Sequence, residues 1–69
     1  MPTAVEHLIE HLKQDIADLE ARAQRAEKLL PHVGEKYQER LKASIDSTWQ
    51  HAKELSELLI EIRQDHPGN

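Results

Sequence analysis

Apolar residues recur at alternating steps of three and four over most of the chain, and this spacing constrains the fold more than any other feature. It runs from Val5 to Leu30 and again from Leu41 to Ile62. A sustained period of 3.5 residues is a heptad repeat, abcdefg, whose a and d positions form a packing seam along a helix. The seam positions are Val5, Ile9, Leu12, Ile16, Leu19, Ala23, Ala26 and Leu30, then Leu41, Ile45, Thr48, Ala52, Leu55, Leu59 and Ile62.

Helix-breaking residues occur at only three places. Pro2 stands at the start, Pro31 and Gly34 in the middle, and Pro67 and Gly68 at the end. Proline and glycine are the strongest local punctuation in a sequence, so the pattern predicts helix, turn, helix. Gly34 is expected to supply a left-handed turn conformation, and the Pro67-Gly68 pair is expected to stop the second helix.

The whole chain is therefore predicted to form a single all-α domain. Its first helix should cover about 4–30, its turn 31–34 and its second helix about 35–65. Thr3 and Glu6 have the spacing of a capping box at the start of the first helix. A short connection makes neighbouring helices antiparallel, which gives an antiparallel two-helix hairpin packed along the heptad seam.

A chain of 69 residues is short for a stable core. A domain of this size buries only about 60% of its unfolded surface, and such chains usually need a disulfide, a metal, very regular helices or self-association. There is no cysteine, which excludes disulfides and fits a reducing cytoplasmic location. There is also no apolar run long enough for a membrane span and no secretory signal pattern.

Several large apolar residues fall outside the seam. In the heptads they take position g, except for one at e and one at b. A stripe widened beyond a and d is typical of helices inside a larger bundle, so we expect the hairpin to dimerise into a four-helix bundle with twofold symmetry. The alternative is that these residues lie half-buried on a monomer. The predicted dimer interface consists of Leu8, Leu29, Trp49 and Leu58.

Charge is distributed unevenly along the predicted hairpin. Residues 22–42, at the turn end, hold six basic and three acidic residues, a net of +3, whereas the remainder holds three basic and ten acidic residues, a net of −7. An antiparallel dimer places each turn end beside the open end of the other chain. The charge therefore favours that arrangement, although surface electrostatics are weak and screened.

Two histidines have a spacing that can bind metal. His7 and His11 lie at i and i+4 with Glu10 between them, which matches the H-x-x-E-H pattern of one class of zinc protease. A metal-binding bundle would use this pair with His66 from the opposite end of the chain. Because such enzymes need a third ligand and a substrate cleft, the preferred interpretation is a solvated helix face. The sequence predicts no cofactor and no catalytic residues.

The function that these features favour is a non-enzymatic protein-interaction module, such as an adaptor, a chaperone or an inhibitor of a larger protein. Aromatic and arginine side chains dominate interface energetics. The residues expected to bind the partner are Trp49, Tyr37, Arg22, Arg25 and Arg40.

Two resemblances bear on these hypotheses. The hairpin, its length and its heptads resemble Rop, a small plasmid protein whose hairpins dimerise and grip paired RNA loops, which implies a nucleic-acid-binding regulator that uses the basic turn end. This chain departs from such a protein because it has no basic stripe along one helix face. Gly34, Tyr37-Gln38 and Leu41 resemble the turn and second helix of hairpin co-chaperones of type III secretion needle subunits.

Overall fold

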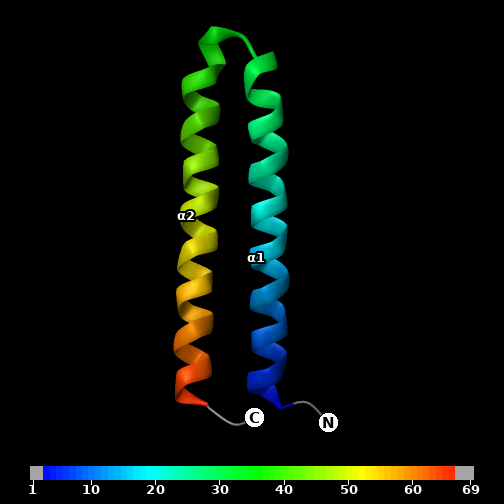
Figure 1. Ribbon diagram of the computed structural model, residues 1–69, viewed down its shortest axis with the longest axis vertical. Helices are drawn as coiled ribbons and strands as arrows, with labels where there is room; N and C mark the ends of the chain where they lie inside the picture. Colours follow the sequence, from blue (N-terminus) through cyan, green and yellow to red (C-terminus); the bar gives the residue numbers. More distant parts are fainter. Residues whose placement is uncertain (1–2, 67–69) are drawn as a thin grey trace.

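The computed structural model describes residues 3–66 and contains two long helices that lie side by side (Figure 1). Helix α1 comprises Ala4–Leu29 and helix α2 comprises Glu35–Asp65, with a 3-10 turn, η1, at Leu30–His32 between them. Over this part of the chain the prediction of an all-helical protein with two helices is confirmed. Pro2, Pro67 and Gly68, which were expected to bound the helices, lie outside the described residues.

Helix α1 begins where the sequence predicts a cap. The backbone N–H of Glu6 donates a hydrogen bond to the Thr3 hydroxyl oxygen at 3.1 Å, and Thr3 has extended backbone geometry. A capping hydroxyl satisfies one of the four N–H groups that have no partner in the first turn, and its loss typically costs about 1 kcal/mol. The structure thus shows the hydroxyl half of the capping box.

The connection differs from expectation at its glycine. Gly34 has φ −63° and ψ 153°, so the predicted left-handed conformation is wrong. The chain reverses instead through the 3-10 turn that contains Pro31, closed by a hydrogen bond from Val33 N–H to Leu30 O at 3.3 Å. Gly34 then acts as the N-cap residue of α2, where extended geometry is normal. Its carbonyl oxygen accepts from Tyr37 N–H at 2.9 Å.

The heptad seam forms the interior of the hairpin. None of its fifteen predicted positions is exposed. The five that are fully buried are Leu12, Ala23, Ile45, Ala52 and Leu59. Two of these are alanines, whose small side chains leave room for larger residues from the other helix. The helices therefore pack along the face that the 3.5-residue period predicts.

The hairpin is a flat rod of 50 × 19 × 13 Å in which the start of α1 and the end of α2 lie together, opposite the turn (Figure 1). Two helices packed along one seam leave two broad faces open, one on each side of that seam. Among the described residues, neither helix has an apolar stretch long enough to cross a membrane.

Candidate functional site

The two broad faces of the hairpin carry different residues. In an antiparallel pair, the g positions of the two helices meet on one side of the seam and the e positions meet on the other. We name the first side, with the adjoining c positions, the leucine face. It comprises Ala4, Leu8, His11, Asp15, Asp18, Arg22, Arg25 and Leu29 of α1, and Tyr37, Arg40, Ser44, Ser47, His51, Glu54, Leu58, Glu61 and Asp65 of α2.

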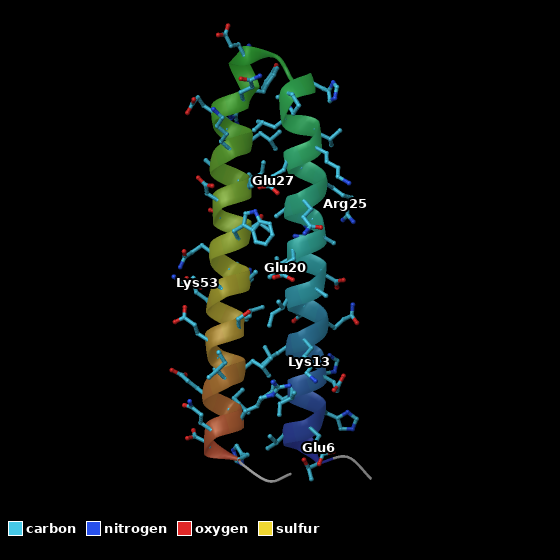
Figure 2. All side chains as sticks on the ribbon, in the orientation of Figure 1. Glu6, Lys13, Glu20, Arg25, Glu27 and Lys53 are labelled. Atoms are coloured by element: carbon cyan, nitrogen blue, oxygen red, sulfur yellow. The ribbon has the colours of Figure 1, made fainter. Side chains whose placement is uncertain are left out.

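We name the opposite side, formed by the e and b positions, the tryptophan face. It comprises Thr3, Glu6, Glu10, Lys13, Ala17, Glu20, Gln24 and Glu27 before the turn, and Glu35, Glu39, Lys42, Asp46, Trp49, Lys53, Ser56, Ile60 and Arg63 after it. Figure 2 shows this side, with Glu6, Lys13, Glu20 and Glu27 in one row along α1.

The leucine face holds most of the exposed apolar surface. Five large apolar side chains are exposed among the described residues, and four of them share position g: Leu8 (45% exposed), Leu29 (59%), Tyr37 (52%) and Leu58 (42%). Leu29 and Tyr37 lie near the turn, whereas Leu8 and Leu58 lie near the open end. The hairpin leaves an apolar patch at each end of this one face, and exposed patches of this kind commonly mark interaction sites.

Charge on the leucine face is ordered along its length. Its three cations, Arg22, Arg25 and Arg40, all lie nearer the turn than any of its acidic residues. The acidic residues, which continue toward the open end, are Asp15, Asp18, Glu54, Glu61 and Asp65. The face is therefore positive near the turn and negative beyond it. Tyr37, at the positive end, also has Lys36 Nζ 5.6 Å from the centre of its ring.

Trp49 lies on the tryptophan face, apart from the other three residues of the predicted interface. It is half-buried, and its indole N–H donates to a carboxylate oxygen of Glu27 at 3.4 Å. Both residues occupy position e, so this bond joins the two helices across the seam. The structure thus separates Trp49 from Leu8, Leu29 and Leu58, and it gives the indole a contact inside the hairpin.

The four other predicted partner-binding residues share one side. Tyr37 and Arg22 are at g, and Arg25 and Arg40 are at c, so all four lie on the turn half of the leucine face. These residues were predicted as partner contacts from their residue types, without a common face. The signal was present in the heptad positions, which place c beside g.

A half-buried glutamine also lies in the seam, one heptad before the first a position predicted for α2. Gln38 occupies an a position, one heptad before Ile45, and its side-chain amide donates to Val33 O at 3.3 Å. It thereby ties the start of α2 to the end of the turn. Extending the seam backward by one heptad from Ile45 would have found it.

The histidine cluster forms an open depression on the outer side of α1. His7, Glu10, His11 and Gln14 line a space of about 240 Å³. Glu10 also forms an ion pair with Lys13 at 3.6 Å. Within residues 3–66 the side chains of histidine, aspartate and glutamate form no group of three or more that could hold a metal ion, so His66 is not brought to His7 and His11.

Comparison with known proteins identifies no relative: the sequence matches no protein-family model, no curated protein and no solved structure. The two faces of the hairpin are therefore the features from which a function can be inferred.

Proposed function

We propose that the protein is a non-enzymatic protein-interaction module, an adaptor, chaperone or inhibitor that acts as a helical-hairpin dimer in the cytoplasm. The observation that carries this proposal is the placement of four large exposed apolar residues at one heptad position, on one face. Apolar surface of this kind stabilises a complex when another chain covers it, by about 25 cal/mol per Å² removed from water.

The leucine face has the composition of a protein interface. Tyr37 supplies an aromatic anchor, and Arg22, Arg25 and Arg40 lie on the same half of the face. Tyrosine and arginine are enriched among residues that dominate binding energy. The leucines add apolar contact, and the acidic residues between and beyond them add polar surface to the face.

The tryptophan face offers a second and smaller contact surface to a larger protein. Trp49 is partly accessible there, and Ile60, eleven residues further along the same side of α2, is 54% exposed. A dimer that covers its leucine faces would present a tryptophan face on each outer side. Binding of a larger protein to this surface would occlude the target without any catalytic group.

A photo-crosslinking experiment tests the larger partner. A crosslinking amino acid replaces Lys42, one heptad from Trp49 on the tryptophan face, and a control variant carries it at Gln14, on the outer side of α1. We expect Lys42, and not Gln14, to yield adducts heavier than two chains of 8.0 kDa. Adducts no heavier than a dimer from both positions would contradict the proposed larger partner.

A Trp49→Ala variant then asks whether the indole is the anchor. Because Trp49 also bonds to Glu27, circular dichroism must first show that the hairpin still folds. Trp49→Phe keeps most of the apolar contact and provides a second variant if the alanine change unfolds the chain. Loss of the heavy adducts with retained helicity would identify Trp49 as a contact residue, whereas unchanged adducts would assign it to the hairpin alone.

A nucleic-acid-binding regulator is the alternative, favoured by the three arginines on one side of the turn half. Contacts from Arg22, Arg25 and Arg40 to three phosphates would make the logarithm of the binding constant fall with a slope of about −2 to −3 against the logarithm of salt concentration. Titration of the protein with RNA and duplex DNA at two salt concentrations measures this slope. The interaction-module proposal expects no binding even at low salt.

A further inference from the structure

We infer that the leucine face is a self-complementary interface, and that a second copy of this chain covers it with its turn beside the first chain's open end. This inference rests on the proposed function and identifies the occupant and orientation of that surface. Its support comes from the order of residues along the g row of α1, from the other charges of the face and from the size of the face.

The g row of α1 reads Leu8, Asp15, Arg22 and Leu29, at seven-residue intervals. A twofold axis midway between Asp15 and Arg22 reverses this row onto its own copy. Leu8 then meets Leu29 of the second copy, and Asp15 meets Arg22. Leucine therefore faces leucine at both ends of the row, and two oppositely charged pairs of Asp15 and Arg22 lie at its centre.

The g row of α2 has a different centre. It reads Tyr37, Ser44, His51, Leu58 and Asp65, again at seven-residue intervals. Trp49 bonds to Glu27, and Figure 2 shows Lys53 level with Glu20, so the centre of the α1 row lies level with α2 between His51 and Glu54. The axis through the α1 row therefore sets His51 against Glu54 of the second copy.

The remaining charges of the leucine face select the orientation. Arg25 and Arg40, at c, lie near the turn, whereas Glu54 and Glu61, at c, and Asp65, at g, lie beyond them toward the open end. With the two turns together, the arginines of both copies would crowd at one end and the acids at the other. With the turns apart, the same axis sets Arg40 against Asp65 of the second copy, and such complementarity fixes the register of an interface.

The face is large enough for a stable dimer. The hairpin is 50 Å long and 19 Å across, so its broad face covers on the order of 900 Å², and specific interfaces bury about 800 Å² per partner. The broad face of one hairpin therefore offers enough area to bind one partner of the same size. A second hairpin laid flat on the first would complete a four-helix bundle, in which the apolar patches at both ends are covered.

Charge variants at the centre of the α1 row test the inference. In Arg22→Asp the row carries two acids, and in Asp15→Arg it carries two bases, so that each variant opposes like charges in its own dimer. We expect each to weaken self-association by about tenfold or more. An equimolar mixture should associate again, because every central contact between the two different chains is then attractive. Analytical ultracentrifugation at matched concentrations measures the mass.

Matched variants on the tryptophan face provide the control. Lys13→Asp and Glu20→Arg make the same two kinds of charge change, also seven residues apart on α1. All four positions are exposed, so none of the changes disturbs the seam. We expect these two variants, alone and mixed, to keep the mass of the wild-type dimer, about twice 8.0 kDa.

The outcomes separate this inference from the proposed function. A wild-type dimer that neither leucine-face variant weakens would overturn the inference but leave a dimeric interaction module that uses another face. A wild-type monomer would overturn both the inference and the dimeric form of the module, whereas heavy adducts from Lys42 would still support binding to a larger protein. A mixture that fails to regain association would refute the antiparallel pairing of Asp15 with Arg22.

Discussion

Leu58 and Leu59 are identical neighbours in the sequence, but they belong to different regions of the molecule. Leu59 occupies seam position a and is 9% exposed, whereas Leu58 occupies position g on the leucine face and is 42% exposed. Leu12 and Leu8 differ in the same way on α1, at 7% and 45%. One step around the helix therefore decides whether a leucine stabilises the hairpin or remains available to another chain.

The largest expected effect comes from truncating the two leucines in turn. Leu59→Ala should lower the free energy of unfolding by about 2–5 kcal/mol, because it leaves a cavity in the seam. Leu58→Ala should cost less than about 1 kcal/mol within the hairpin. Urea unfolding followed by circular dichroism measures both.

The same measurement at several protein concentrations separates folding from association, because self-association makes stability depend on concentration. We expect Leu58→Ala, and not Leu59→Ala, to lower mainly the part of the unfolding free energy that depends on protein concentration. Equal losses from the two variants at every concentration would show that the seam and the leucine face do not differ in role.

Most of the fold could be predicted from the sequence, because a 3.5-residue period permits few arrangements. Each of the seam residues, from Val5 to Ile62, is buried or half-buried. The turn could not be predicted in detail. Gly34 was expected to be left-handed, but the 3-10 turn through Pro31 reverses the chain and leaves Gly34 extended. Proline and glycine fix where a turn occurs more firmly than they fix its geometry.

The candidate site could be predicted less well. The residue types were identified, but Trp49 was grouped with Leu8, Leu29 and Leu58 although it occupies e rather than g. Residues at e and g flank the seam on opposite sides, and the antiparallel direction that the short turn predicts brings e to e and g to g, so the heptad positions already separate Trp49 from the leucines. The heptads do not fix how far one helix is shifted along the other, and this shift brings Trp49 to Glu27. The hydrogen bond between Trp49 and Glu27, both at e, shows that meeting directly.

An intermediate effect is expected from enlarging a seam alanine. Ala23 is 1% exposed, so Ala23→Leu must displace residues of α2 and should destabilise the hairpin by about 1–3 kcal/mol. Ala17→Leu makes the same change at an exposed position on the tryptophan face and should alter stability by less than about 0.5 kcal/mol. Thermal unfolding of both variants measures the difference, and an unaffected Ala23→Leu variant would mean that the helices are more loosely packed there.

The smallest effect concerns the one polar residue among the predicted seam positions. Thr48 is half-buried at position d, and its hydroxyl donates to Ser44 O, one turn earlier in α2, at 2.9 Å. This bond within the helix satisfies the hydroxyl, but such back-bonding slightly destabilises helices. Thr48→Val keeps the shape of the side chain and replaces the hydroxyl with a methyl group. A fully buried methyl group stabilises by about 0.8 kcal/mol. Because Thr48 is only half-buried, the change should stabilise the hairpin by about 0.5 kcal/mol.

Thermal unfolding is again the measurement. A destabilised Thr48→Val variant would mean that the hydroxyl contributes more through its hydrogen bond than a methyl group gains by burial. Thr48 would then be a polar position that the seam requires, and the heptad pattern alone would not describe the hairpin interior. A gain in stability would instead show that burial of a single methyl group is enough to strengthen the seam.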